Sequence, residues 1–196
     1  MSRENPTRNM LPSKLRSIVA LGANLPSSHG PPSRTLDRAV ELLEEAGIRV
    51  TARSRWFSSP AWPEGSGPDY VNGAIAVEGP DGEALLSLLH QIETILGRTR
   101  KAGRWDARVC DLDILCIDGK VLPDETTWRR IAAGPAEGER PGLVLPHPLL
   151  HERAFVLVPL ADVAPDWRHP VLGATVADML AALSEDDVAD VRPLPG

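Results

Sequence analysis

Hydrophobic positions along the chain alternate between helix-like and strand-like spacing. Apolar residues recur three and four apart in segments 35–46 and 82–96, each followed by glycine, so both segments are predicted helices. Short apolar or alternating runs predict strands at 17–21, 48–57, 70–78, 109–117 and 155–160. Further along, Asp118-Gly119 predicts a hairpin turn that leads to a short strand at 120–122. We expect a long polar loop at 123–142 and a C-terminal helix at 175–183.

The order strand, helix, strand, strand, helix, strand predicts an α+β fold. We expect a ferredoxin-like sandwich, with helices packed on a mainly antiparallel sheet. A doubly wound parallel sheet is the alternative, but it would need a glycine fingerprint after the first strand. Leu21-Gly22-Ala23-Asn24 matches neither G-x-G-x-x-G nor a Walker loop. One domain is expected over residues 17–184, after a flexible extension at 1–16 and before a polar tail at 185–196.

Composition is ordinary for a globular protein, with 42% hydrophobic residues and a net charge of −6. No apolar run approaches the roughly 20 residues of a membrane helix, and the N-terminus lacks a hydrophobic signal core, so we expect a cytoplasmic protein. Cys110 and Cys116 are the only cysteines. They lie roughly 20 Å apart in one predicted strand, which is too far for a disulfide, and are expected as core thiols.

One stretch of this acidic chain, residues 97–117, begins strongly basic. Its cations are Arg98, Arg100, Lys101, Arg104 and Arg108. A single concentrated cluster indicates a local anion site rather than general affinity for nucleic acid, which would spread further over the surface. Arginine rather than lysine favours bidentate contacts with phosphate groups.

Asp111 and Asp113 follow this cluster directly, two residues apart in a predicted strand. Side chains alternate along a strand, so both carboxylates are expected on the same face. Taken by itself, a D-x-D pattern would ordinarily mean one buried, hydrogen-bonded aspartate and one aspartate at the edge of the strand. Here the apolar neighbours predict burial, and two close buried carboxylates repel each other unless a cation lies between them. A hard metal ion beside phosphate-binding arginines is the arrangement used in phosphoryl transfer.

Further candidates for a binding site are His90, Glu93, His147, Tyr70, Asn72, Phe155 and Trp105. Most have an ordinary alternative. An acid on a helix flank is usually solvated, a histidine between two prolines can simply complete a turn, and a lone aromatic residue usually belongs to the core. A tryptophan in so polar a segment, by contrast, suggests that it covers something.

Four segments resemble the 6-hydroxymethyl-7,8-dihydropterin pyrophosphokinase family of the folate pathway. They are LGANL, PDYVNGAIAVE, IETILGRTRKAGRWDARVCDLDIL and LPHPLLHERAFVLVPL. The third is the most specific, because it joins R-x-R, R-W-x-x-R and D-x-D at the family's spacing. The resemblance runs from about Ile18 to Trp167. It implies an α+β sandwich that moves the terminal diphosphate of ATP onto the pterin hydroxymethyl group and releases AMP.

The resemblance also implies roles for individual residues. Asp111 and Asp113 would ligate two Mg²⁺ ions that bridge the ATP phosphates. The catalytic set would be Arg98, Arg100, Arg108, Asp111 and Asp113. The ATP site would contain His90, Glu93, Arg98, Arg104, Trp105, Arg108, Ile114, His147 and Arg153. The pterin site would contain Ser59, Pro60, Ala61, Trp62, Tyr70, Asn72, Trp105, Asp111 and Phe155. The chain departs from the family at Leu149, where arginine is frequent.

Two other classes compete with this interpretation. A nucleotidyltransferase would also use D-x-D, but it would transfer AMP and release pyrophosphate. An RNA-binding module on a similar sandwich would stack bases on clustered sheet aromatics, whereas this acidic chain has two phenylalanines and one tyrosine. We therefore expect a monomer whose partners are ATP and the pterin, without nucleic-acid or membrane partners.

Overall fold

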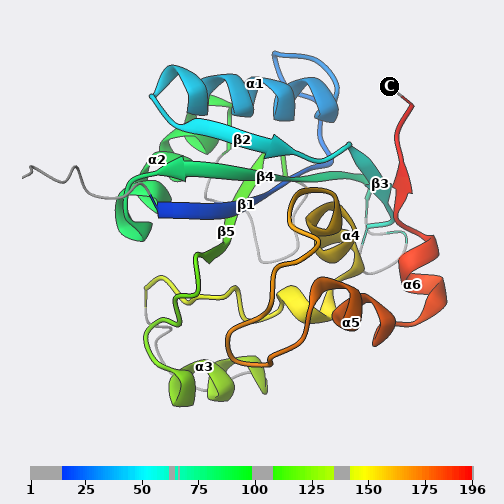
Figure 1. Ribbon diagram of the computed structural model, residues 1–196. Coiled ribbons are helices and arrows are strands. Elements are labelled where there is room, and N and C mark those ends of the chain that lie inside the picture. Colours follow the sequence, from blue (N-terminus) through cyan, green and yellow to red (C-terminus); the bar gives the residue numbers. More distant parts are fainter. Residues whose placement is uncertain (1–14, 62–64, 66, 99–107, 135–141, 196) are drawn as a thin grey trace, which may run out of the picture.

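An antiparallel sheet with helices on both faces forms the centre of the protein (Figure 1). The computed structural model describes residues 15–61, 65, 67–98, 108–134 and 142–195. The strands are β1 (Leu15–Ala23), β2 (Arg49–Arg53), β3 (Phe57–Ser59), β4 (Tyr70–Gly79), β5 (Asp111–Ile117) and β6 (Arg192–Pro193). Their order is β5-β1-β4-β3-β6, with β2 also paired to β4, and every pair is antiparallel. The predicted α+β, ferredoxin-like class is confirmed.

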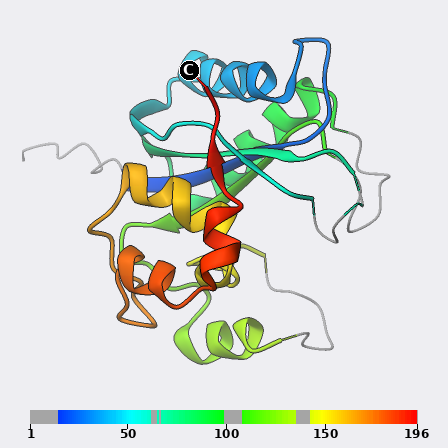
Figure 2. The same ribbon diagram turned by 90° about the vertical axis from the view of Figure 1, so that its right-hand side faces the viewer.

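Helices lie on both faces of the sheet, as Figure 2 shows from the side. They are α1 (Pro32–Glu45), α2 (Gly82–Ile95), α3 (Glu125–Ala132), α4 (Ala154–Val163), α5 (Val176–Ala181), α6 (Glu185–Ala189) and a 3₁₀ turn, η1 (Leu150–Glu152). The α2 helix begins where the Asp81 side chain accepts a hydrogen bond from the Ala84 amide, and it ends before Gly97, whose φ is 97°. The three predicted helices, at 35–46, 82–96 and 175–183, are confirmed as α1, α2 and α5.

Strand β1 contributes to the core on both faces. Val19 and Leu21 pack in the cluster that includes α1 and α2, whereas Ile18 packs in the cluster of α4 and α5. This alternation follows from the two-residue period of a strand buried on both sides. In β5, Leu112 and Ile114 belong to the α1–α2 cluster, so Asp111 and Asp113 lie on the opposite face, the one that α4 covers.

The predicted strand at 155–160 is wrong, because these residues belong to helix α4. An apolar run of this length fits a buried strand and a buried helix equally well, since both place apolar residues at nearly every position. Within the helix, Val156, Leu157 and Leu160 are buried, while Phe155 is turned away from the core and is 39% exposed.

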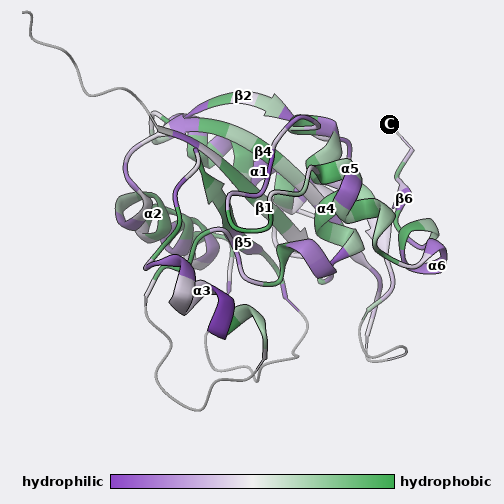
Figure 3. Ribbon diagram, turned by 60° about the horizontal axis from the view of Figure 1, so that its bottom comes forward, coloured by the Kyte–Doolittle hydropathy of each residue, from purple (hydrophilic) through white to green (hydrophobic). Residues whose placement is uncertain are grey.

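The segment 123–142 contains a helix rather than the predicted loop. The Asp124 side chain caps α3 by accepting from the Thr127 amide at 2.9 Å. Figure 3 shows α3 as mostly hydrophilic, but Trp128 is buried and donates from Nε1 to the Pro146 carbonyl at 2.6 Å. The Trp128 ring also contacts the His151 and His169 rings, and Arg129 donates to the Val171 carbonyl at 3.0 Å, so several contacts anchor the helix. The turn at Asp118-Gly119 is present, yet the strand predicted at 120–122 is wrong, because Leu122 pairs with Leu145 instead.

The segment predicted as one strand at 48–57 forms β2 and then β3. Ser54 separates the two strands, with its hydroxyl bonded to the Ala74 amide and the Arg55 carbonyl. Beyond residue 184, α6 leads to β6, which pairs with β3. Both cysteines are buried, and burial raises each thiol pKa to about 12. Among the described residues, no helix is long and apolar enough to cross a membrane.

Candidate active site

The two carboxylates of D-x-D lie at the start of β5, on the face covered by α4. Across β1, Asp111 is opposite Gly22 and Asp113 is opposite Ala20. The prediction that both carboxylates share a face is therefore confirmed. The expected burial is wrong for Asp113, whose residue surface is exposed. Nonetheless, surrounding protein atoms partly desolvate its carboxyl group, and the negative charge of Asp111 adds to this effect. Together they raise the pKa of Asp113 to about 6.

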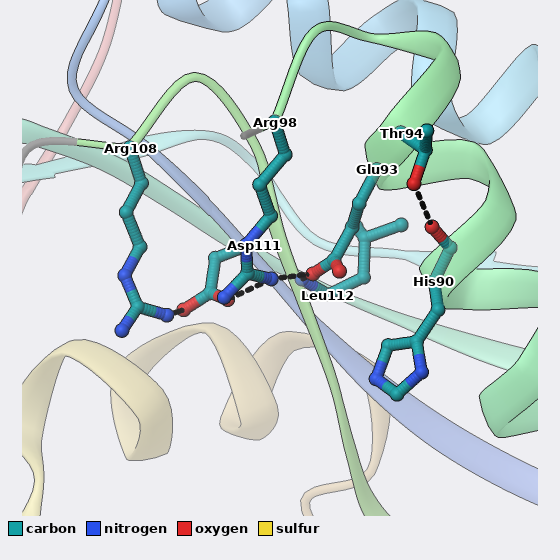
Figure 4. A network of polar contacts seen from close by, with 7 residues as sticks. All are labelled: His90, Glu93, Thr94, Arg98, Arg108, Asp111 and Leu112. Carbon is teal, nitrogen blue, oxygen red and sulfur yellow. Dashed lines mark hydrogen bonds and ion pairs between the residues drawn. The ribbon is translucent and has the colours of Figure 1, made fainter. Parts of the chain in front are cut away.

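Two arginines neutralise Asp111, one at each carboxylate oxygen. Arg98 Nη1 lies 2.7 Å from Oδ1, and Arg108 Nη1 lies 2.5 Å from Oδ2. Arg98 also forms an ion pair with Glu93, and Figure 4 shows these side chains as a continuous row. Two of the arginines expected near D-x-D are thus brought to it by the fold.

Glu93 is buried between α2 and β5 and is only 1% exposed. Its Oε1 accepts from the Leu112 backbone amide at 2.9 Å and also from Arg98. Burial raises the pKa of Glu93, while the Leu112 amide and Arg98 favour its charged form. The alternative of a solvated flank acid is therefore excluded. One turn earlier, the His90 backbone carbonyl accepts a hydrogen bond from the Thr94 hydroxyl at 2.8 Å (Figure 4). His90 also lines an open hollow of about 530 Å³ with Ser87, Gln91, Thr94 and Ile95.

Polar residues of β3 and β4 lie beside the carboxylates. Gly22 in β1 is opposite Asn72 on one side and Asp111 on the other. Neighbouring strands lie about 4.8 Å apart, so the Asn72 and Asp111 backbones are about 10 Å apart on a common face. Asn72 donates from Nδ2 to Ser59 Oγ at 2.9 Å, and both residues are buried. Tyr70 is half-buried on the same face, and burial raises its pKa.

The first turn of α4 closes another side of this face. Arg153 lies with its guanidinium carbon 5.6 Å from the centre of the Phe155 ring. Burial lowers the pKa of Arg153, whereas the charge of Asp113 favours its protonated form. Phe155 was predicted in the wrong kind of element, yet its ring is exposed near the site.

The remaining predicted site residues have different environments. The Ile114 side chain is buried in the core formed with α1 and α2. His147 donates from its backbone amide to the Leu115 carbonyl at 2.7 Å, and its Nδ1 accepts from the Leu149 amide. Ser59 and Ala61 are buried, and Pro60 between them is exposed. Trp62, Arg100, Arg104 and Trp105 lie outside the described residues.

Sequence reasoning missed one residue at this end of the sheet, Asn24. In the sequence it stands out only as one member of the LGANL segment. Its buried side chain bonds to backbone groups of Pro68 and Arg108. A signal was available, because asparagine directly after a buried strand supplies both an amide donor and a carbonyl acceptor.

The donor set at D-x-D fits a hard divalent cation. Asp111 and Asp113 are two carboxylates on one face, and a cation would relieve the repulsion that adds to desolvation in raising the pKa of Asp113. Within the described part of the chain, no cluster of three or more His, Cys, Asp or Glu residues could hold a metal ion. Two carboxylates with other positions left to water and phosphate oxygens are typical of Mg²⁺.

The fold and the site together define a class: an enzyme that transfers a phosphoryl-type group on an antiparallel α+β sandwich. The family model of 7,8-dihydro-6-hydroxymethylpterin-pyrophosphokinase (HPPK) matches residues 18–165. The chain belongs to this family. It is thus a pyrophosphokinase of folate biosynthesis, with ATP as co-substrate and hydroxymethyldihydropterin as acceptor. The nucleotidyltransferase and RNA-binding alternatives are set aside.

Individual relatives agree with the family match. The chain is 37% identical over 181 residues to the 2-amino-4-hydroxy-6-hydroxymethyldihydropteridine pyrophosphokinase of Methylorubrum extorquens, covering 90% of this chain and 99% of the relative. The enzyme of the same name from Pseudomonas aeruginosa is 36% identical over 182 residues, covering 92% and 98%. The fold resembles Plasmodium falciparum HPPK-DHPS with pteroate, with a TM-score of 0.63 and 13% identity over 86% of this chain. The chain spans 44% of that longer protein.

Proposed function

We propose that the α4-covered face of the sheet is the active site, with Asp111 and Asp113 binding two Mg²⁺ ions and Tyr70 and Phe155 stacking the pterin. One observation supports this assignment: Gly22 pairs with both Asn72 and Asp111, so these two proposed ligand-binding residues lie on either side of one β1 position. We further propose that the chain acts as a monomer in the cytoplasm.

The arginines supply positive charge for the ATP phosphates. In the free chain, Arg98 and Arg108 are held by Asp111. Asp111 would be one of the residues holding the metal, and Arg98 and Arg108 would then be free to contact phosphate oxygens. Glu93 keeps its own contact with Arg98, so this arginine stays beside the site after Asp111 releases it. Mg²⁺ held by Asp111 and Asp113 would supply positive charge that offsets the negative charge of the phosphates.

The pterin would stack between the half-buried Tyr70 and the exposed ring of Phe155, since stacking would remove both faces of the planar heterocycle from water. Asn72 commits its Nδ2 to Ser59, which directs Oδ1 over Gly22. A side chain at Gly22 would contact that oxygen at 3.5 Å. The glycine therefore leaves Oδ1 accessible to an N–H donor on the pterin rim.

In this site the pterin hydroxymethyl oxygen attacks the β-phosphorus of ATP in line. A new P–O bond forms to the pterin, the bond from the β-phosphorus to the α–β bridging oxygen breaks, AMP leaves, and the hydroxyl proton passes to water. The protein contributes mainly by positioning the reactants and stabilising the phosphate charge. His90 and the hollow that it lines lie on the ATP side, and Arg100, Arg104 and Trp105 are assigned to ATP by sequence resemblance alone.

The decisive experiment is incubation with ATP, Mg²⁺ and 6-hydroxymethyl-7,8-dihydropterin, followed by chromatography of the nucleotides. AMP should appear in step with the pterin diphosphate, and excess chelator should stop both. ADP as product, release of pyrophosphate, or turnover that persists in chelator would contradict the proposal. Sedimentation at several concentrations tests the monomer.

A further inference from the structure

We propose that Asn24 is a positioning residue that holds the pterin side and the metal side of the site in fixed relation through one buried amide. The proposal rests on the proposed assignment of those two sides. Asn24 follows β1 directly and is 4% exposed.

Both ends of the Asn24 amide are used, on different segments. Its Oδ1 accepts from the Arg108 backbone amide at 2.7 Å, and its Nδ2 donates to the Pro68 carbonyl at 3.2 Å. The backbone amides of Asn24 and Leu25 both donate to the Arg108 carbonyl, at 2.9 and 3.2 Å. Arg108 is therefore held at both its N–H and its C=O.

These two segments lead directly into the strands of the site. Pro68 comes two residues before Tyr70, where β4 begins, and Arg108 comes three residues before Asp111, where β5 begins. The pairing of β1 with β5 ends at Gly22 and Asp111, and the pairing of β1 with β4 ends at Ala23 and Val71. Asn24, the next residue after β1, connects the two neighbouring strands just beyond these last pairs.

The position of the Arg108 backbone determines where its guanidinium group can reach. That group forms an ion pair with Asp111 in the free chain. Likewise, the position of Pro68 sets the start of β4 and so the ring of Tyr70. An error of about 1 Å in such a group can cost about 100-fold in rate, so a residue that contacts neither substrate can still control turnover.

Asparagine has a short side chain that carries both a hydrogen-bond acceptor, for the Arg108 amide, and a donor, for the Pro68 carbonyl, at neutral pH. Aspartate has the same shape and would still accept from the Arg108 amide, but as a carboxylate it has no donor for the Pro68 carbonyl. Alanine removes both bonds. The two substitutions therefore separate the two contacts.

The test compares Asn24→Ala and Asn24→Asp with a matched control, Ser54→Ala. Ser54 is also buried and also joins two backbone groups, at Arg55 and Ala74, but away from both segments. For each protein we would measure kcat and KM, calorimetric affinity for an ATP analogue with Mg²⁺, pterin affinity with the analogue saturating, and Tm. Binding is repeated at high salt, which screens the charge that Asn24→Asp adds.

We expect Asn24→Ala to lower kcat/KM for the pterin about 100-fold. Asn24→Asp should weaken pterin binding about tenfold and leave nucleotide affinity at high salt within about threefold of the wild type. Ser54→Ala should lower Tm and leave both affinities unchanged. The proposal is overturned if Asn24→Ala lowers only Tm, as Ser54→Ala does, or if Asn24→Asp weakens both ligands equally at high salt.

If Asn24→Ala does not fold, the proposal is tested on Asn24→Asp alone, by pterin affinity and by hydrogen exchange of the Arg108 amide. The Arg108 amide should stay protected in Asn24→Asp while pterin affinity falls; loss of that protection with unchanged pterin affinity overturns the proposal. Wild-type AMP formation is measured first. A wild type without turnover refutes the proposed function, whereas an active wild type with indifferent Asn24 variants refutes only this inference.

Discussion

Phe155→Ala tests the pterin side of the site without a large effect on the fold. The ring is 39% exposed on the first turn of α4, whereas its neighbours Val156 and Leu157 are buried. Truncating a fully buried phenylalanine costs about 3–5 kcal/mol, so a ring with more than a third of its surface in water should cost about 1–2 kcal/mol of folding stability. Stacking of a flat base on an aromatic side chain contributes about 1–3 kcal/mol. At about 1.4 kcal/mol per factor of ten, pterin affinity should fall roughly ten- to hundredfold.

Calorimetry with the pterin, in the presence of a saturating ATP analogue, measures this loss, and urea unfolding measures the stability. Leu172→Ala is the matched control, because Leu172 is 40% exposed and lies before α5, outside the proposed site. It should leave pterin affinity unchanged. Pterin affinity within twofold of the wild type in Phe155→Ala would refute the stacking role. An equal loss of nucleotide affinity would mean that the pterin pocket is misplaced.

Asp111→Ala and Asp113→Ala should each lower kcat at least about 1,000-fold, because a lost metal clamp removes several kcal/mol of transition-state stabilisation; AMP release checks this, and near-normal turnover would contradict it. Glu93→Ala should destabilise the chain about 1–2 kcal/mol more than Glu93→Gln, which keeps an acceptor for the Leu112 amide; equal urea midpoints would refute this. Burial lowers the pKa of His169 to about 4, below its unfolded value of about 6.5. The unfolded chain therefore binds the extra proton, and stability should fall by up to about 3 kcal/mol as pH drops from 6.5 to 4, a slope that His169→Phe should flatten.

Local patterns predicted the elements whose signals are complete within a few residues. Asp81 caps α2, Gly97 ends it, and the alternation along β1 and β5 assigns Asp111 and Asp113 to one face. These features depend on backbone geometry and on near neighbours in sequence, so a local pattern is enough to predict them. Tertiary contacts then reinforce the same conformation.

Elements that depend on distant contacts were missed or misassigned. The α4 helix has an apolar residue at nearly every position, so its period is hidden, and only packing against β4 and α5 determines its form. Glu93 sits on a helix with a polar flank, yet it is buried because the Leu112 amide and Arg98 meet its carboxylate. The partners of Asn24 lie 44 and 84 residues away. No local pattern carries such information.

The burial of both native thiols has a practical consequence for watching this protein work. With a pKa of about 12, Cys110 and Cys116 hold about one thiolate in 100,000 at neutral pH, and neither is reachable from solvent. A cysteine introduced on the surface would then be the single site that a maleimide dye modifies. At exposed Asp69, just before Tyr70, such a dye would report on the start of β4 during turnover, with both native cysteines left in place.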